Sequence, residues 1–307
     1  MSLLVVGSVA FDAIETPFGK TDKIVGGAAS YIVRSASYFN QSIHLVSVVG
    51  GDFPQFELDF MKSKGVDLQG LEIRKDEKSF FWSGKYGRDL NSRETLVTEL
   101  NVLANFNPTL PEGYKKPSIV MLGNLHPAVQ FNVLEQLTSK PKLVVMDTMN
   151  FWMDSAMQDV LKTLQRIDVL TINDEEARQL SGQYSLIKAA KKIMGLGPKY
   201  LVIKKGEHGA LLFHENAVFY APALPLEDVF DPTGAGDTFA GGFVGYLAKT
   251  NNLTFNNFKI AIIYGSALAS FCVEKFGTEG INKLDTNIII NRAKQFIELV
   301  QCDFSLE

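Results

Sequence analysis

The residues best suited to chemistry lie at 231–238, where the chain reads DPTGAGDT just before an apolar run. A glycine-rich turn that leads into a helix exposes backbone N–H groups at the helix N-terminus, where the helix dipole also stabilises negative charge. Gly234 and Gly236 can adopt positive φ, so the amides of Gly234, Ala235 and Gly236 are predicted to hold a phosphate. Asp237 would repel that phosphate unless it acts on a proton or a metal, and it is the predicted general base. An aspartate that only caps the helix is the alternative.

A second pair of motifs follows the first predicted strand. Asp12 ends the segment GSVAFD, and a carboxylate at that place can accept hydrogen bonds from the paired hydroxyls of a sugar. Gly26 and Gly27 form a tight turn before a helix, which would let a ligand approach the backbone. An ordinary turn aspartate and close helix packing are the alternatives. No Gly-x-Gly-x-x-Gly pattern follows this strand, which removes the main support for dinucleotide binding.

An acidic motif, NDEE at 173–176, follows another predicted strand and opens a helix. Carboxylates in a first helical turn can act through the helix dipole alone, and Asn173 can simply cap the helix. Beside a phosphate site, however, such residues suit Mg²⁺, which proteins usually hold through one or two carboxylates, waters and substrate phosphates. Glu176 is the predicted metal residue, with Asn173 behind it.

A basic turn, KKGEHG at 204–209, follows the predicted strand Tyr200 to Ile203. Lys204 at the end of a strand can reach a nucleotide phosphate, and Gly206 permits close passage of the ligand. A hairpin turn with solvated lysines is the alternative. His44, His126, His208 and His214 have no Ser, Cys or metal-ligand spacing around them, so neither a hydrolase triad nor a zinc enzyme is supported.

The elements that must position these motifs alternate between short apolar strands and helical patterns. Runs that are apolar at nearly every position are typical of strands covered on both faces, so we expect a mostly parallel central sheet with helices on each side. Ligands bind such folds beyond the carboxyl ends of the strands. The strands are expected near 3–6, 43–49, 119–122, 143–146, 169–172 and 200–203, and the helices near 28–39, 53–64, 128–137, 155–164, 174–180 and 186–194.

One segment breaks this alternation. Residues 71–102 read as strands and turns, with strands expected at 71–74, 79–86 and 94–100. The predicted organisation is an α/β domain at 1–70 and 103–307, with a β-strand lid inserted at 71–102. Exposed aromatic strand faces seldom stay uncovered, so the lid is also a predicted dimerisation surface.

Composition limits the partners and the compartment. The 307 residues are 46% hydrophobic with a formal net charge of -4, which argues against nucleic-acid or acidic-membrane binding. No stretch approaches the roughly 18 apolar residues that a membrane span needs. The two cysteines, Cys272 and Cys302, have no metal-like spacing and do not indicate a disulfide framework. A cytoplasmic protein is expected.

Together the motifs resemble the ribokinase or PfkB family of carbohydrate kinases, in the same order and over almost the whole chain. The match comprises Gly7-Ser8 with Asp12, Gly26-Gly27, Asn173-x-x-Glu176, and residues 231–239 with the glycines that follow. The resemblance implies a three-layer α/β/α fold with a small β-sheet lid, ATP and Mg²⁺, and often dimers through the lid. Pro232 departs from the family's usual threonine or valine, and only 13 residues separate Asp12 from Gly26.

The same resemblance assigns roles to residues. Asp237 matches the catalytic base, Gly234 to Gly236 the anion hole, Asn173 with Glu176 the magnesium motif, and Asp12 with Gly27 the sugar-binding region. The nucleotide side is expected to include Lys204, Gly206, Gly209 and Thr233, with adenine near residues 264–269 and Gly277. Asn150, after the strand that ends at Asp147, is expected on the acceptor side.

The predicted function is transfer of the γ-phosphoryl of Mg-ATP to a hydroxymethyl group of a sugar or sugar-like alcohol. A nucleoside kinase of the same fold is the alternative, because Trp82, Phe80 and Phe81 could stack on a base. A non-catalytic sugar or nucleotide sensor is a further alternative, and a dehydrogenase is the remaining α/β option. An activating monovalent cation such as K⁺ is left open.

Overall fold

The large sheet forms from segments that are buried along almost their whole length. The computed structural model describes residues 1–39 and 42–302. The strands of this sheet are β1 (Leu3–Val6), β5 (Ile43–Gly50), β6 (Val66–Arg74), β9 (Ile119–Leu122), β10 (Leu143–Asp147), β11 (Val169–Asn173), β12 (Tyr200–Lys204), β13 (Ala210–His214) and β14 (Ala217–Ala221). Their order is β14-β13-β12-β11-β10-β9-β1-β5-β6.

The seven strands from β12 to β6 in this order are parallel, and β13 and β14 complete the sheet as antiparallel strands. The chain leaves β1 in one direction toward β5 and β6, and it later returns on the other side of β1 with β9 and β10. The sheet therefore has a switch point at β1, where ligands of such folds bind beyond the strand ends.

Helices cover both faces of the large sheet. One face packs against α1 (Ala28–Ser37), α2 (Gln55–Ser63), α8 (Ala235–Thr250) and α9 (Phe255–Val273), and α10 (Thr286–Glu298) packs on α9. The other face packs against α3 (Pro127–Glu135), α4 (Asn150–Ser155), α5 (Met157–Leu164), α6 (Asp174–Ser181) and α7 (Leu186–Met194). Short 3₁₀ helices lie at Asn101–Leu103, Glu112–Tyr114, Gly206–His208 and Glu279–Ile281.

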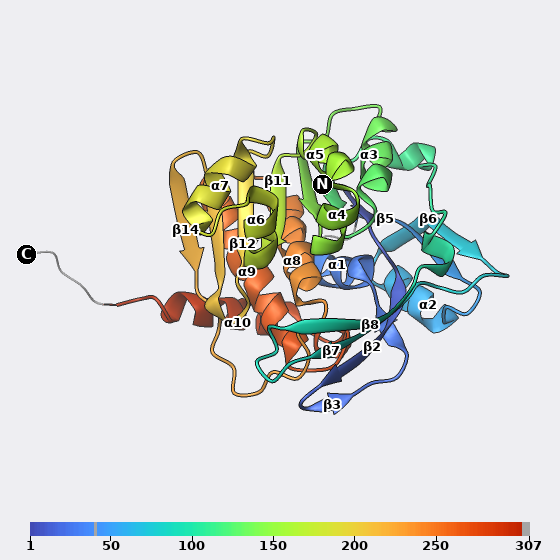
Figure 1. The fold of residues 1–307 in the computed structure, drawn as a ribbon, viewed down its shortest axis with the longest axis horizontal. Coiled ribbons are helices and arrows are strands. Elements are labelled where there is room, and N and C mark those ends of the chain that lie inside the picture. The colour runs from blue at the N-terminus through green and yellow to red at the C-terminus, as the bar shows by residue number, and fades with distance from the viewer. Residues whose placement is uncertain (40–41, 303–307) are drawn as a thin grey trace, which may run out of the picture.

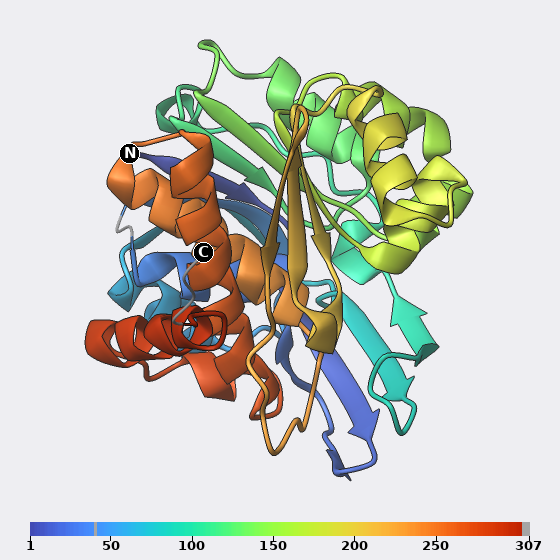
Figure 2. The ribbon, with the colours of Figure 1, turned by 90° about the vertical axis from the view of Figure 1, so that its left-hand side faces the viewer.

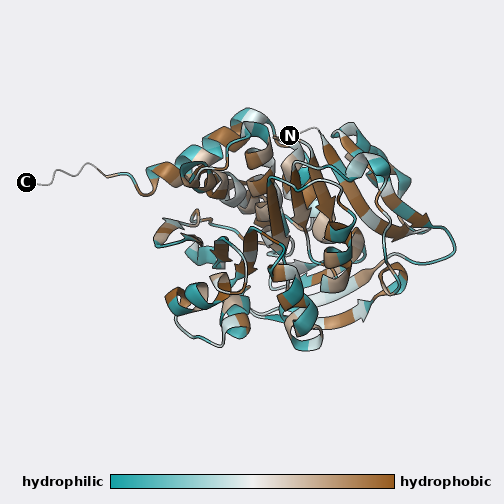
Figure 3. Cartoon of the chain, turned by 90° about the horizontal axis from the view of Figure 1, so that it is seen from above, coloured by the Kyte–Doolittle hydropathy of each residue, from teal (hydrophilic) through white to brown (hydrophobic). Residues whose placement is uncertain are grey.

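The predicted layers are visible in the ribbon. Figure 2 shows the orange and red helices on one side of the large sheet and the yellow and green helices on the other. Apolar residues concentrate in the strands between the two helical layers, and hydrophilic residues lie on the outer helices (Figure 3). No helix in the described part of the chain is long and apolar enough to cross a membrane.

A smaller sheet lies beside this body, at the lower edge of the view in Figure 1. It contains β2 (Ala10–Thr16), β3 (Gly19–Lys20), β4 (Ile24–Gly26), β7 (Phe81–Tyr86) and β8 (Arg93–Glu99). The strand β2 pairs with β3 and β4 in antiparallel fashion and with β7 in parallel, and β8 closes the other edge. Every residue of β8 is exposed.

The small sheet differs in composition from the predicted lid at 71–102. Residues 71–74 belong to β6, where they pair with β5 in the large sheet. Residues 10–26, which were expected in the main domain, supply three strands of the small sheet. The predicted boundaries are therefore wrong at both places, because β2 pairs with a strand some seventy residues away and a pattern within either segment cannot reveal that partner.

Asp52, just after β5, ties the small sheet to the body. Its Oδ1 accepts hydrogen bonds from the Ser79 backbone N (2.8 Å) and Oγ (2.7 Å), and its Oδ2 lies 2.7 Å from Lys23 Nζ. The Lys23 ammonium also lies over the Phe11 ring, 3.9 Å from its centroid. One carboxylate thus holds the segment before β4 and the segment before β7.

Candidate active site

The turn before α8 has the positive φ that was expected of its glycines at one of the two positions, Gly234. Gly234 has φ 74° and ψ 0° and immediately precedes α8. A Cβ on Gly234 would lie 2.3 Å from the Tyr31 ring, so both conformation and space require glycine there. Gly236 does not adopt positive φ, since it lies within the first turn of α8. A Cβ there would lie 3.0 Å from Lys204 Nζ, a tight contact that would require the end of the lysine side chain to shift.

The first turn of α8 leaves backbone donors available. Ala235 N donates to Pro232 O at 3.2 Å, whereas the amides of Gly236 and Asp237 have no acceptor among the described residues. Unpaired amides at a helix N-terminus favour an anion, as does the helix dipole. The structure thus places free donors and Lys204 around the same two residues of the turn.

Asp231 fixes the conformation of this turn through hydrogen bonds to backbone amides. It is fully buried, and its two oxygens accept hydrogen bonds from Thr233 N (2.8 Å) and Gly277 N (2.9 Å). Gly277 has φ 56°, so its conformation favours glycine. Gly277 thus joins the turn through Asp231. Pro232 has no backbone N–H, and it is accommodated because no hydrogen bond of the turn requires a donor at that position.

Asp237 lies in a group of buried and half-buried charges that converge from the ends of four elements, β10, β12, α6 and α8. Burial, and then the nearby Asp147 carboxylate, raise the pKa of Asp237 to about 7. Burial and Asp147 likewise raise the pKa of Glu176 to about 7. Lys204 Nζ lies 2.6 Å from Asp147 Oδ2, and Thr171 Oγ1 donates to the same oxygen at 2.9 Å. A carboxyl with a pKa near neutrality is well suited to accept a proton at physiological pH.

Asn173 and Glu176 form a reciprocal cap on α6. Asn173 Oδ1 accepts from Glu176 N, and Glu176 Oε2 accepts from Asn173 N, both at 2.7 Å. The capping alternative therefore holds for this pair, and Glu176 is at the same time buried beside Asp147. No group of three metal-ligating side chains forms a ready-made metal site in the described part of the chain. The mutual repulsion of Glu176 and Asp147 nevertheless fits a cation held partly by waters and substrate phosphates.

Asp12 reaches this group from the small sheet. It lies within β2, not in a turn, and its Oδ2 would be only 1.8 Å from a Cβ on Gly26. The Gly27 backbone hydrogen-bonds the Asp12 carboxyl, but burial, with the charges of Asp231 and Asp237, raises the pKa of Asp12 to about 7. Gly27 itself has φ 84° and begins α1. Asp12, Gly26 and Gly27 are therefore one unit, electrostatically coupled to Asp237.

The two glycines of the basic turn at 204–209 have different surroundings. Gly206 (φ 53°) and Gly209 (φ 76°) both have positive φ; Gly206 begins the 3₁₀ helix Gly206–His208, and Gly209 directly follows it. A Cβ on Gly206 would lie 3.3 Å from Asn91 Oδ1, at the tip of the β7–β8 hairpin. A Cβ on Gly209 would lie 2.1 Å from Ala221 O of β14, so this glycine serves sheet packing.

Asn150 does not join the group around Asp237. Its Nδ2 donates to Gln179 Oε1 of α6 at 2.5 Å. Asn124 is better placed than Asn150 to contact an acceptor. It follows Gly123, whose Cβ position would lie 3.5 Å from the Ala28 side chain at the start of α1. Asn124 Oδ1 accepts from Trp152 Nε1 at 2.8 Å, and its Nδ2 lies 3.0 Å from Met149 Sδ.

From the sequence, Asp147 and Tyr86 receive no role, and Arg93 is expected either to contact the substrate or simply to solvate the tip of the lid turn. Tyr86 is buried, and its hydroxyl accepts a hydrogen bond from Thr233 Oγ1 at 3.0 Å, which joins β7 to the phosphate turn. Asp147 carried a usable signal, because it ends a buried strand as Asn173 and Lys204 do. Tyr86 carried none, and Arg93 could be named only as one of several polar residues of the lid turn, since the roles of both depend on how the small sheet is placed.

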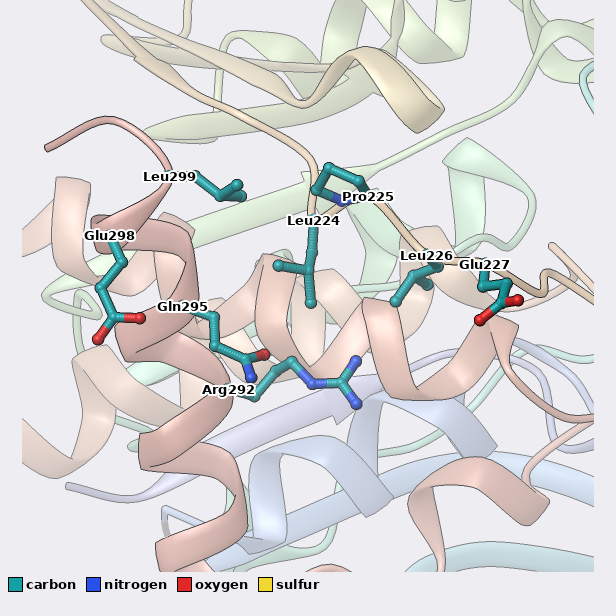
Figure 4. Close-up of a pocket in the computed structure, with 8 residues that line it drawn as sticks. All are labelled: Leu224, Pro225, Leu226, Glu227, Arg292, Gln295, Glu298 and Leu299. Carbon is teal, nitrogen blue, oxygen red and sulfur yellow. The ribbon is translucent and has the colours of Figure 1, made fainter.

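A cavity of about 530 Å³ lies apart from the group of charges around Asp237 (Figure 4). It opens between the segment that leads to Asp231 and the end of α10. Its lining residues are Leu224, Pro225, Leu226, Glu227, Arg292, Gln295, Glu298 and Leu299. Arg292 is held by Ser270 Oγ (3.1 Å) and Glu274 Oε2 (3.2 Å) of α9, so this wall is fixed.

Comparison with known proteins agrees with this arrangement. The model of the pfkB family of carbohydrate kinases matches residues 2–285. The chain is 31% identical over 253 residues to a cytidine kinase of Thermococcus kodakarensis, a match that covers 80% of this chain and 88% of the relative. It is 26% identical over 320 residues to a nucleoside kinase of Methanothermobacter thermautotrophicus, with 94% of each chain covered.

Solved structures show the same fold. The nucleoside kinase of Burkholderia thailandensis in complex with inosine superposes with a TM-score of 0.77 at 19% identity, covering 97% of this chain and 99% of that chain. A ribokinase from Thermotoga maritima gives a TM-score of 0.75 at 19% identity, covering 96% and 99%. The predicted ribokinase-like fold is confirmed. The chain belongs to the pfkB family of carbohydrate kinases and is a phosphotransferase.

Proposed function

We propose that this kinase transfers the γ-phosphoryl of Mg-ATP to the hydroxymethyl group of a nucleoside, with Asp237 as the general base. The observation that carries the proposal is the position of Asp237, half-buried in the first turn of α8 beside unpaired amides and Lys204. An attacking hydroxyl there would meet a base with a pKa near neutrality. Its target phosphate would meet the donors that neutralise developing charge.

In the proposed step, the acceptor oxygen forms a bond to the γ-phosphorus as the bond from that phosphorus to the β,γ-bridging oxygen breaks. Asp237 takes the hydroxyl proton, and ADP leaves with the electron pair of the broken bond. The turn from Gly234 to Gly236 and Lys204 hold the transferring group, with the unpaired Gly236 amide as a donor, since the Ala235 amide is bonded to Pro232 O. Glu176 and Asp147 would hold Mg²⁺ through water, with Asn173 fixing Glu176. The metal would neutralise charge on the phosphates.

Two observations favour a nucleoside acceptor. The relatives with the greatest similarity reported above are named cytidine kinase and nucleoside kinase. Asp12 and Gly27 suit the ribose hydroxyls, and the Asn124, Met149 and Trp152 group at the ends of β9 and α4 offers an amide and an aromatic ring for a base. A free sugar is the second candidate, because a ribokinase of Lactococcus lactis is also 24% identical over 291 residues.

The decisive experiment measures ADP release from Mg-ATP with nucleosides, sugars, sugar acids and polyols, with Asp237→Asn run in parallel. Turnover on a nucleoside that falls about 10²-fold or more in the variant supports both the reaction and the base. Turnover on ribose or fructose alone identifies the second candidate. Binding of ATP without turnover of any acceptor would identify a sensor and refute the kinase.

Three further features belong to this proposal. We propose a homodimer through the exposed strand β8, where Leu96 and Val97 are about half exposed, and sedimentation of Leu96→Lys tests it.

An activating K⁺ near the buried Asp231 is tested by turnover in potassium and tetramethylammonium salts. A cytoplasmic location is consistent with two free cysteines, Cys272 and Cys302.

A further inference from the structure

The β7–β8 hairpin touches both turns of the proposed phosphate site. Tyr86 at the end of β7 is bonded to Thr233, and Asn91 in the hairpin tip lies against Gly206. Asp89 stabilises that tip by accepting hydrogen bonds from Asn91 N and Ser92 N, each at 3.2 Å. The tip is therefore an ordered structure placed over the two turns.

Arg93 is the first residue of β8 and lies opposite Tyr86 in the strand register. Its guanidinium carbon lies 5.2 Å from the centre of the Trp82 ring, and its side chain hydrogen-bonds Tyr86. In the part of the chain that the structure describes, Arg93 forms no ion pair with a carboxylate within 4.0 Å. The ring and the tyrosine thus hold a cation that has no counter-ion of its own.

The charge of Arg93 acts on the active-site carboxylates. It lowers the pKa values of Asp12, Glu176 and Asp237, although burial outweighs this effect in each case. Those three residues come from β2, α6 and α8, and the strand partner of Arg93, Tyr86, is bonded to Thr233 just before α8, which places Arg93 on the side of the small sheet that contacts the phosphate turn. Lys204, the other cation of the site, is already paired with Asp147.

A triphosphate that enters this site meets several buried carboxylates and one lysine that is partly neutralised. An additional cation is needed at the γ-phosphoryl, where negative charge must be held during transfer. A guanidinium can donate to two phosphate oxygens at once, which suits it to this position. We propose that Arg93 binds the transferring phosphoryl group of ATP from the small-sheet side, opposite the α8 amides. This role rests on the proposed kinase function.

The test compares binding of Mg-ADP with binding of the Mg complex of the non-hydrolysable β,γ-imido analogue of ATP, by calorimetry and without acceptor. The variants are Arg93→Gln and Arg93→Lys, and Arg88→Gln is the matched control because Arg88 is an exposed arginine of the same hairpin. Arg93→Gln is expected to weaken the triphosphate analogue about tenfold and to leave ADP within about twofold. Arg93→Lys recovers part of the loss, and Arg88→Gln changes neither ligand.

Turnover gives a second readout. Arg93→Gln is expected to lower kcat by about 10²-fold, with the KM of the acceptor little changed. Equal weakening of ADP and the analogue, no weakening of either, or a loss confined to the KM of the acceptor would overturn the role of Arg93. Failure of the wild-type chain to bind either nucleotide would instead refute the kinase function, and the two failures are therefore distinguishable.

Discussion

Lys204 and Asp147 form a largely buried ion pair between the ends of two strands that are not neighbours in the sheet. Their Nζ and Oδ2 atoms are 2.6 Å apart, and β11 lies between β10 and β12. Burial opposes the charge on Lys204, but Asp147 and Glu176 outweigh it and raise the pKa of the lysine. Lys204 therefore stays protonated at the pH where Asp237 titrates, and it holds its charge next to Gly236.

The pH dependence of turnover should follow Asp237. Because burial and Asp147 raise its pKa to about 7, the base is increasingly protonated below that pH, and kcat/KM is expected to fall there. Asp147→Asn removes one raising charge and frees Lys204, so the acidic limb of the profile should move to lower pH. Profiles of kcat/KM between pH 5 and 9 measure this. An acidic limb that stays in place in Asp147→Asn would contradict the coupling.

Stability should also respond to these carboxyls. The pKa of Asp237 is about 7 in the folded chain against a usual 3.8, so ionisation between those values costs stability as the pH rises through that window. Asp237→Asn removes this cost, and at pH 8 without ligand its Tm should exceed that of the wild type by about 2 °C or more. At pH 4 the difference should largely vanish.

Thermal melts at both pH values measure the effect of Asp237→Asn, with Asp228→Asn, an exposed aspartate, as the control. A variant that is no more stable than the wild type at pH 8 would mean that the folded chain does not disfavour the Asp237 charge.

Gly234→Ala should damage both stability and turnover. The new Cβ would require φ 74° of an alanine and would lie 2.3 Å from the Tyr31 ring. The expected loss is about 1–3 kcal/mol of unfolding free energy, with near-complete loss of activity because the anion-binding turn must shift. Gly113→Ala is the matched control, since nothing lies within 4 Å of its Cβ position. Denaturant unfolding and the kinase assay measure both effects, and equal behaviour of the two variants would count against the strain.

Tyr86 and Thr233 should act as one contact between the small sheet and the phosphate turn. Tyr86→Phe and Thr233→Ala each remove the 3.0 Å hydrogen bond, so each should raise the KM for ATP by about 2- to 10-fold. The double variant should be no worse than the poorer single variant, because the same bond is lost. A double-mutant cycle on kcat/KM measures this, and simple additivity would show that the two side chains act independently.

The sequence predicted the body of the fold more accurately than the small sheet. The residue ranges of β9 and α7 agree with the expected ones, and β10, β11 and β12 differ by a single residue, because apolar runs and helical periodicity are local signals. The pairing of β2 with β7 is not local. It depends on contacts such as Phe11 with Phe81, which no pattern within either segment contains.

The same distinction applies to the site. Asp237 and Gly234 could be singled out because the turn and the helix of the proposed anion site follow one another in the chain. Asp147 and Lys204 are 57 residues apart, and only the parallel sheet brings their strand ends together. Asn150 was placed on the acceptor side by its nearness to a strand end, but its amide is bonded to Gln179.

The way the small sheet is connected limits how it can move. Within the described residues, the chain passes between the small sheet and the body at 7–9, at Gly27, at 75–80 and at Leu100, and Asp52 binds both Ser79 in one of these crossings and Lys23 of the small sheet. A small sheet that is connected to the body at four places moves as a rigid unit and does not unfold and refold around its ligand. Closure over a substrate would therefore order few new residues, so its entropic cost would be small and the backbone amides of β2 and β7 would stay protected from exchange throughout the catalytic cycle.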